Sequence, residues 1–218
     1  MATLLVEIGC EELPASACRE AERQLPELAR RVLGVEPSRI LVTPRRLAVL
    51  ADDVPAQTAD EWVKGPPLAM REKAAAGFAK RHGVSADDLE ERDGFLGVEV
   101  AGKPLAEVLP GQVDELVKSL AFPKTMRWDD GGVRFPRPVR WRLAMLDSTR
   151  IVGDRSYGHR FLSGPIEVGD AAGYVDALRA ADVEPDTEAR RKAIVAGLDA
   201  LGGWSDPNGV LAEVVYLV

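Results

Sequence analysis

Short strand-like runs alternate irregularly with helical segments along this chain of 218 residues. The first run, 3–8, is rich in leucine and β-branched residues and ends at Gly9, which predicts a buried strand. Residues 11–33 then place apolar side chains at helical spacing, and 40–54 predicts two strands around a turn at 43–46. Because helices and strands do not follow a βαβ rhythm, the sequence predicts an α+β fold with helices packed on a mixed or antiparallel sheet.

Proline and glycine mark the expected breaks in this pattern. Pro26 is expected to kink or divide the first helix, and Pro110 to interrupt a later one. The stretch GGWSDPNG at 202–209 is the best candidate for a boundary. It would separate a module of residues 1–201 from a segment of residues 202–218.

Two further segments carry turn signals. Residues 61–63 predict a short strand, and the Lys-Gly-Pro-Pro sequence at 64–67 predicts a rigid turn after it. Residues 126–128 and 133–135 flank Asp-Asp-Gly-Gly at 129–132, which predicts a β-hairpin.

Charge is distributed unevenly along the chain. The net charge is −7 and the isoelectric point is about 5, which argues against a general nucleic-acid-binding protein. Residues 122–160, however, hold nine Lys or Arg and four Asp, a balance of +5 that leaves −12 for the rest of the chain. An acidic body with one basic face can bind RNA locally. The alternative is that these arginines decorate a solvated sheet face.

Few residues suit catalysis or metal binding. Cys10 and Cys18 form no CxxC motif, and His82 and His159 stand far from both, so we expect neither a zinc site nor a disulfide. No phosphate-binding glycine loop and no nucleophile elbow is present. We therefore expect no catalytic residue and no metal site. His159 is either a hydrogen-bonded structural residue or a contact to RNA or a partner subunit.

The N-terminal sequence MATLLVEIGCEELP lacks a basic region and becomes acidic early, so it does not resemble a signal peptide. No apolar run approaches the length of a membrane span. The sequence predicts a cytoplasmic protein with no membrane partner. The adjacent carboxylates Glu11 and Glu12 are expected to favour the positive end of the following helix dipole.

Cations beside stiff turns and aromatic rings are the candidate RNA contacts. Thr43, Arg45 and Arg46 surround Pro44 at a tight turn, where guanidinium groups can grip phosphates bidentately. Another basic block, FPKTMRWDDGGVRFPRPVRW, carries Trp128 and Trp141, which are either stacking platforms or core residues. The rival role for its arginines is pairing with acids inside the module or at a subunit interface. The candidate RNA-contacting residues are Arg45, Arg46, Lys64, Lys124, Arg127, Arg134, Arg137, Arg140, His159 and Arg160.

Six segments, in order, resemble the bacterial glycyl-tRNA synthetase beta subunit. They are LLVEIGCEELP (4–14), TPRRLAVL (43–50), VKGPP (63–67), AAAGFAKRHGV (74–84), the FPKTMRW and RFPRPVRW block (122–141) and GHRFL (158–162). Residues 206–218 resemble the start of the next family segment. Cys10 departs from the pattern, which usually has Thr there. Beta subunits of this family are several times longer, so the resemblance implies an N-terminal fragment.

The resemblance implies a subunit of glycine–tRNA ligase, a class II aminoacyl-tRNA synthetase built from two alpha and two beta chains. The alpha subunit would form glycyl-adenylate with ATP and Mg, whereas this fragment would bind no cofactor. The expected partners are tRNA(Gly) and the alpha subunit, and no DNA. Residues 1–201 would be similar to the B3/B4 module of phenylalanyl-tRNA synthetase beta subunits.

Three functions therefore stay open. The first is tRNA(Gly) binding combined with alpha/beta assembly. The second is a protein-interaction scaffold that docks the alpha subunit without touching RNA. The third is a vestigial aminoacyl-tRNA hydrolase, which is the weakest because glycine is the smallest amino acid and a tight primary pocket already excludes larger ones.

Overall fold

The computed structural model describes residues 1–128 and 130–218. They form two compact units. Unit 1 comprises Met1–Ala56 and Ala106–Val218, and unit 2 comprises Gln57–Leu105. Unit 2 is thus an insertion in the sequence of unit 1, which the sequence does not predict.

The stretch 202–209 does not separate two units in the structure. Residues on both sides of it belong to unit 1. Arg190 Nε donates to the Val215 carbonyl at 3.0 Å and Arg190 Nη2 to the Val42 carbonyl at 2.6 Å. This buried guanidinium therefore ties the C-terminal segment to the central sheet.

A five-stranded antiparallel sheet forms the centre of unit 1. In spatial order its strands are β10 (Thr149–Val152), β9 (Val139–Leu146), β1 (Ala2–Cys10), β3 (Arg46–Val54) and β2 (Arg39–Thr43). The predicted strand at 3–8 and the two strands around 43–46 are confirmed. β1 is the middle strand and is buried from Leu4 to Cys10, which explains its almost continuous apolar sequence. The α+β class is confirmed.

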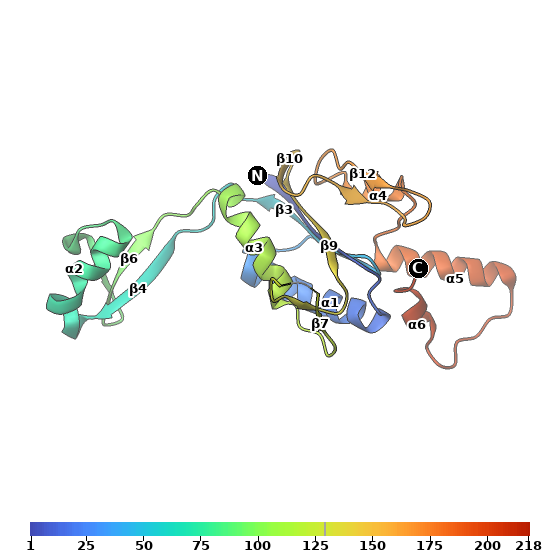
Figure 1. The fold of residues 1–218 in the computed structure, drawn as a ribbon, viewed down its shortest axis with the longest axis horizontal. Coiled ribbons are helices and arrows are strands. Elements are labelled where there is room, and N and C mark those ends of the chain that lie inside the picture. The colour runs from blue at the N-terminus through green and yellow to red at the C-terminus, as the bar shows by residue number, and fades with distance from the viewer. Residues whose placement is uncertain (129) are drawn as a thin grey trace. The chain divides into compact units, whose positions relative to one another are not determined.

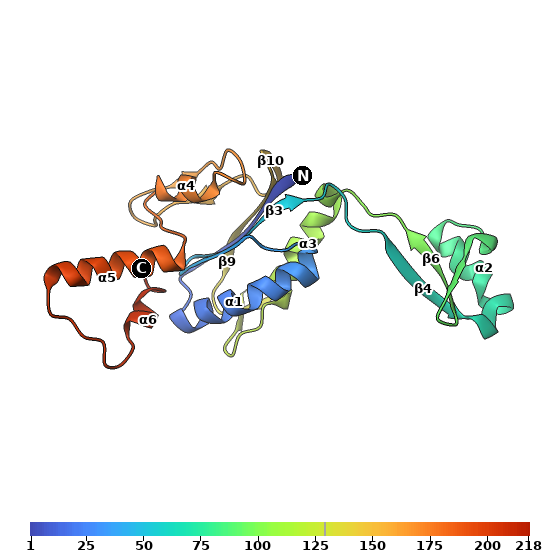
Figure 2. The same ribbon diagram turned by 180° about the vertical axis from the view of Figure 1, so that it is seen from behind.

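Helices cover both faces of this sheet, with α1 and α3 on one side and α4 on the other (Figures 1 and 2). The helices of unit 1 are α1 (Ala15–Leu28), which continues as a π-helical turn (Ala29–Leu33), α3 (Leu105–Ser119), α4 (Tyr174–Arg179), α5 (Thr187–Leu201) and α6 (Leu211–Val214). Within the described chain, no helix is both long and apolar enough to cross a membrane.

The two prolines disturb the helices less than predicted. α1 continues through Pro26 and changes to π-helical geometry three residues later, so the break is displaced toward the C-terminus. The predicted interruption at Pro110 is wrong, because α3 is continuous. Proline removes one backbone donor, and the buried side chains of Leu109 and Val113 hold the helix across that position.

Short strand pairs complete unit 1. They are β7 (Met126–Arg127) with β8 (Arg134–Phe135), and β11 (Ser156–Tyr157) with β12 (Pro165–Ile166). The predicted hairpin around 129–132 is confirmed for the described residues, and Asp129 lies outside them.

Unit 2 packs one helix on a three-stranded antiparallel sheet. Its strands, in spatial order, are β4 (Glu61–Pro67), β6 (Phe95–Val100) and β5 (Glu90–Arg92), and its helices are α2 (Arg71–His82) and the 3₁₀ turns Leu68–Met70 and Ala86–Asp88. The predicted turn at 64–67 is wrong. β4 continues through Pro67, because it is an edge strand with a register shift after Lys64, where proline is tolerated.

The face of the central sheet that packs against α4 carries polar and aromatic groups near one end of β1. Leu5 joins Leu143 and Met145 in a core cluster under α4. Further along β1, Gly9 pairs with Trp141 of β9. A Cβ atom built on Gly9 would lie 1.8 Å from Trp141 Cε2, so the indole occupies the space that glycine leaves free.

We expect Gly9→Ala to lower the free energy of unfolding by about 1–3 kcal/mol, because the added methyl group overpacks the contact with Trp141. Urea denaturation followed by circular dichroism measures this change. Gly197→Ala in α5 is the control, since a methyl group added there would meet no atom within 4 Å, and it should stabilise by up to about 1 kcal/mol. A Gly9→Ala variant as stable as the wild type would contradict this packing.

Candidate nucleic-acid interface

The carboxylates of Glu11 and Glu12 hold three of the predicted RNA-contacting arginines. Arg140 Nε lies 3.4 Å from Glu11 Oε1, and Arg45 Nε lies 3.7 Å from Glu12 Oε1. Arg160 lies 3.6 Å from Glu11 and also hydrogen-bonds to Glu12. The hydrogen bond from Arg160 holds the pKa of the Glu12 carboxyl below its usual range. The charges of these arginines are therefore compensated within the protein.

This arrangement differs from the helix-dipole role predicted for the two glutamates. α1 begins at Ala15 and has no acidic residue in its first turn. Glu11 and Glu12 lie before it, where they join the β2–β3 turn, β9 and the loop after β11. The rival prediction of internal ion pairing is confirmed for Arg140.

Arg46 is 2% exposed and lies in the interior of unit 1. Its Nη2 donates to the Tyr157 carbonyl at 2.7 Å, which fastens β11 to the end of β3. The guanidinium is therefore a support for the neighbouring loop, and the adjacent Arg45 presents the more accessible cation of the turn.

Glu7 shares this buried region and is fully buried on the central strand. Ser156 Oγ donates to Glu7 Oε1 at 2.8 Å. Burial raises the pKa of Glu7, and the charge of Arg46 opposes this shift. The Tyr174 hydroxyl and the Trp141 indole N–H also lie near this carboxyl and lower its pKa. Neither group makes a hydrogen bond of standard geometry. A lone Glu in the apolar run 4–8 was the available sequence signal for this cluster.

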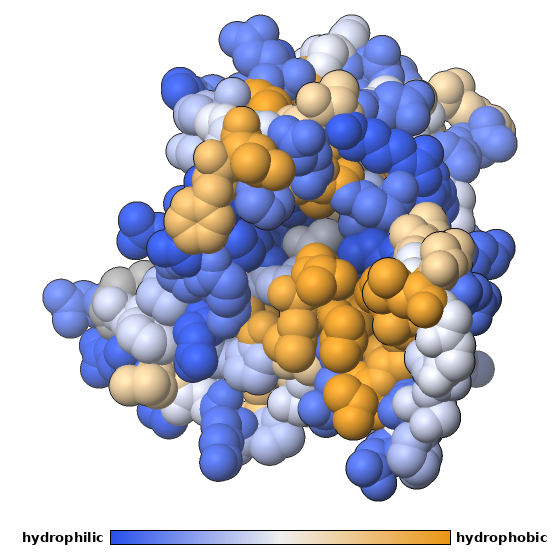
Figure 3. All heavy atoms as spheres, turned by 90° about the vertical axis from the view of Figure 1, so that its right-hand side faces the viewer, coloured by the Kyte–Doolittle hydropathy of each residue, from blue (hydrophilic) through white to orange (hydrophobic). Residues whose placement is uncertain are grey.

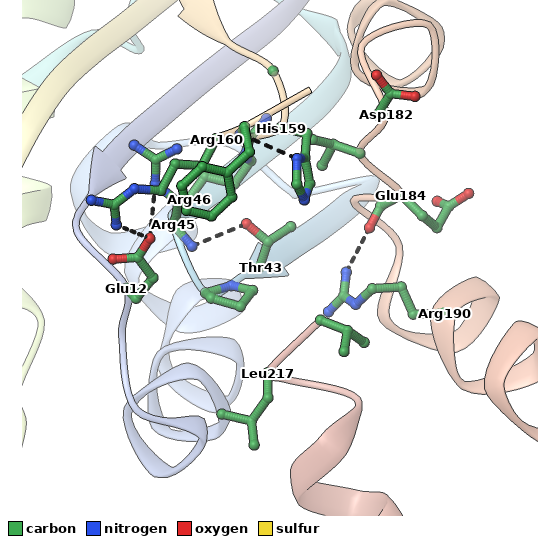
Figure 4. A pocket seen from close by; sticks show the side chains of 15 residues that line it. Glu12, Thr43, Arg45, Arg46, His159, Arg160, Asp182, Glu184, Arg190 and Leu217 are labelled. Carbon is green, nitrogen blue, oxygen red and sulfur yellow. Dashed lines mark hydrogen bonds and ion pairs between the residues drawn. The ribbon is translucent and has the colours of Figure 1, made fainter. Parts of the chain in front are cut away.

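A pocket of about 320 Å³ opens beside the β2–β3 turn (Figure 4). Its lining residues are Glu12, Thr43, Pro44, Arg45, Arg46, Gly158, His159, Arg160, Phe161, Asp182, Val183, Glu184, Arg190, Leu217 and Val218. Most of its charged groups are already engaged. Arg190 donates to three backbone carbonyls, and Glu184 accepts from Arg179 at 2.8 Å.

His159 organises the turn at the pocket mouth. Its Nδ1 accepts the backbone N–H groups of Phe161 at 3.3 Å and Leu162 at 3.2 Å (Figure 4). In the neutral ring the proton therefore sits on Nε2. Throughout residues 1–128 and 130–218, no carboxylate hydrogen-bonds to this imidazole. The arrangement matches the structural alternative and gives no support to the hydrolase hypothesis.

The turn displays apolar side chains. Phe161 is 84% exposed and Leu162 is 70% exposed, and Leu217 and Val218 on the other side of the pocket are also exposed. Figure 3 looks at the end of the molecule that carries α5 and α6 and shows hydrophobic residues gathered on it. The rim of the pocket is thus partly apolar.

The cations of the β7–β8 hairpin differ from those around Glu11 and Glu12, because several have uncharged partners. Arg134 donates from Nε to Thr125 Oγ1 at 3.2 Å and from Nη2 to the Thr125 carbonyl at 3.3 Å. Arg137 donates to the Pro136 carbonyl at 3.1 Å, and Lys124 is exposed. The hydrogen bonds orient Arg134 and Arg137, and in the part of the chain that the structure describes no carboxylate forms an ion pair with Lys124, Arg134 or Arg137.

Arg127 and Arg134 stand directly opposite each other in the hairpin. Like charges in this position destabilise a strand pair by roughly 0.2–1 kcal/mol. Arg127 has a distant ion pair with Asp130, at 3.8 Å.

Trp128 and Trp141 have different environments. Trp128 is 40% exposed, and its Nε1 donates to the Phe135 carbonyl at 2.9 Å. Phe135 is buried and packs edge-to-face on Phe122, with ring centroids 5.0 Å apart. Trp141 instead packs on Gly9 and lies 4.7 Å from the Tyr157 ring. Trp128 is therefore the exposed ring of the basic block.

Lys64 lies in unit 2, whereas the other candidate residues belong to unit 1. Its Nζ sits 3.3 Å from the centre of the Phe95 ring on the neighbouring strand. This cation–π contact gives Lys64 a local role on the sheet of unit 2.

The described residues hold no cluster of three or more His, Cys, Asp or Glu side chains placed to bind a metal ion. Cys10 and Cys18 are free and buried, and burial raises the pKa of both thiols. Reactive thiolates are usually exposed beside cations, so neither cysteine has the environment of a nucleophile.

We expect Glu7→Gln to flatten the dependence of stability on pH. The unfolded chain has a Glu pKa near 4.5 and the native pKa is higher, so native Glu7 keeps a proton that the unfolded chain has lost. Stability should then fall as pH rises from 4.5 through the native pKa in the wild type, and fall less in the variant. Urea denaturation across this range measures the slopes.

Glu12→Gln is the control for this experiment, because the pKa of Glu12 is shifted in the opposite direction. Its stabilising contribution is present above 4.5 and lost as pH falls through the native pKa, so the substitution should flatten only the acidic side. Parallel pH profiles for the wild type and Glu7→Gln would rule out the proposed shift at Glu7.

Comparison with known proteins places this geometry in a family context. Residues 4–218 match the family model described as glycyl-tRNA synthetase beta subunit. The chain is 37% identical to the glycine–tRNA ligase beta subunit of Trichodesmium erythraeum, in a match that covers 99% of this chain and 35% of the relative. It is 38% identical to the beta subunit of Picosynechococcus, covering 100% of this chain and 36% of the relative. The chain thus spans about a third of the length of these relatives.

Proposed function

The chain belongs to the glycyl-tRNA synthetase beta subunit family, and we propose that it contacts tRNA(Gly) through the β7–β8 hairpin and contributes to alpha/beta assembly. The hairpin surface comprises Lys124, Arg127, Trp128, Arg134 and Arg137. In the whole enzyme this region serves glycine–tRNA ligation in the cytoplasm, while the alpha subunit uses ATP and Mg to form glycyl-adenylate.

The observation that carries the proposal is the division of the basic residues into two groups. Arg45, Arg140 and Arg160 face carboxylates, whereas Arg134 and Arg137 are oriented by neutral oxygen atoms. An arginine that is oriented but not neutralised can exchange its water for a phosphate without first breaking an ion pair. The acidic remainder of the chain repels RNA elsewhere and favours this one face.

The proposed assembly role extends the family resemblance. Residues 1–201 are expected to be similar to the B3/B4 module of phenylalanyl-tRNA synthetase beta subunits, and the antiparallel sheet with helices on both faces is compatible with such a module. Arg46, buried beneath the β2–β3 turn, acts in this proposal by holding that turn in place. Lys64 contacts RNA only if unit 2 also takes part.

The exposed turn at the pocket favours a second candidate function, docking onto the alpha subunit without RNA contact. Phe161 and Leu162 are both largely exposed on a turn that His159 fixes. Rigid, exposed apolar side chains are typical anchors of protein interfaces. This surface and the hairpin can serve the two roles independently.

Binding to tRNA(Gly) across a salt series tests the RNA contact. We expect the affinity of the wild-type chain to fall as salt rises, since phosphate contacts release counterions. The triple variant Lys124→Ala, Arg134→Ala and Arg137→Ala should bind more weakly, and the slope of log affinity against log salt should shrink by up to about 2–3 units.

The matched control is Arg140→Ala, which removes an arginine of the same block that Glu11 neutralises. It should change affinity and slope much less than any hairpin substitution. Wild-type affinity in the triple variant, or a larger loss in Arg140→Ala, would exclude the hairpin as the RNA surface. If the chain binds the alpha subunit but does not bind RNA, the docking function is favoured.

A further inference from the structure

The exposed Trp128 side chain indicates which part of an RNA the hairpin binds. This inference rests on the proposed RNA contact and names its ligand more closely. We propose that the hairpin binds an unpaired nucleotide of the RNA, with its base stacked on the exposed face of the Trp128 indole.

Trp128 has the properties of a prepared stacking surface. The side chain is 40% exposed although tryptophan gains more from burial than other residues. Its single polar atom is already satisfied by the Phe135 carbonyl, so the ring cannot rotate freely. Phe135 is itself fixed in the core against Phe122. A base can therefore stack on the indole without the cost of ordering it.

The flanking cations suit the phosphates on either side of such a base. Arg134 and Lys124 come from the strand and the loop next to Trp128, and neither is neutralised by a carboxylate among the described residues. Single-strand binding surfaces combine these two elements, aromatic rings for bases and cations for the backbone.

A duplex cannot use the ring in this way. Bases inside a helix are already stacked on both faces, and only unpaired bases at ends, loops or bulges are free to stack on a side chain. The ligand class is therefore a single-stranded element of the RNA, and a paired stem would meet only the cations.

The other tryptophans lack this combination. Trp141 lies on Gly9 and is approached by Arg45 at 5.8 Å. Trp62, in unit 2, has Arg92 over its ring at 5.3 Å, and that arginine is paired with two glutamates. Trp204 donates to an Asp199 carboxylate at 2.7 Å, which places a negative charge beside it.

Affinities for a short single-stranded RNA and for a blunt duplex of matched length test the inference. Trp128→Leu should weaken single-strand binding by roughly 5- to 150-fold, the range of one stacked base, and leave duplex binding nearly unchanged. Trp128→Phe loses the same hydrogen bond to the Phe135 carbonyl as Trp128→Leu but keeps an aromatic ring, so it should bind the single strand more tightly than Trp128→Leu. Equal losses for both RNAs, or no loss for the single strand, would overturn the proposal.

A second measurement uses the wild-type chain and does not depend on folding of a variant. A single-stranded RNA containing 2-aminopurine should lose fluorescence on binding, because the analogue is quenched when it stacks on an aromatic ring. Binding without quenching at any position of the analogue would overturn the proposed stacking while leaving the phosphate contact intact. Absence of salt-sensitive binding to either RNA would instead sink the proposed RNA contact itself.

Discussion

Burial of a carboxylate and a guanidinium on adjacent central strands is the constraint on which the pocket side of unit 1 depends. Glu7 on β1 and Arg46 on β3 are both almost fully buried, and each holds β11, through the Ser156 hydroxyl and the Tyr157 carbonyl respectively. Removing either side chain deletes one of these two tethers and leaves a buried polar group without its partner, which typically costs about 1–3 kcal/mol. The loop after β11 is thereby fixed to the sheet, and His159 then shapes its tip.

The presence or absence of a neighbouring carboxylate determines how much positive charge an arginine of this chain can offer to a ligand. The Arg140 guanidinium lies 3.4 Å from the Glu11 carboxylate, so it is held in position but offers little net charge to an incoming phosphate. Arg134, held by Thr125, keeps both its orientation and its charge. Counting basic residues along the chain therefore overestimates the proposed RNA surface, and the geometry of their partners is the better guide.

Local sequence patterns predict most strands of the central sheet because those strands are buried on both faces and therefore consist of apolar runs. Tertiary packing overrides two local signals. Buried side chains carry α3 past Pro110, and the open edge of the unit 2 sheet lets β4 run through Pro67. The ion pairs of Glu11 and Glu12 could not be predicted, since their partners come from segments distant in sequence and only the fold brings them together.

The same dependence on long-range contacts explains how so short a hairpin can hold the geometry of the proposed nucleotide site. β7 and β8 have two residues each, and an isolated pair of this length is not stable in water. Phe135 anchors the pair in the core, and the Trp128 indole closes it by bonding to the Phe135 carbonyl. One bond thus stabilises the hairpin and orients the exposed ring. Because folding of unit 1 already fixes this geometry, a nucleotide that binds there spends little of its interaction energy on ordering the protein.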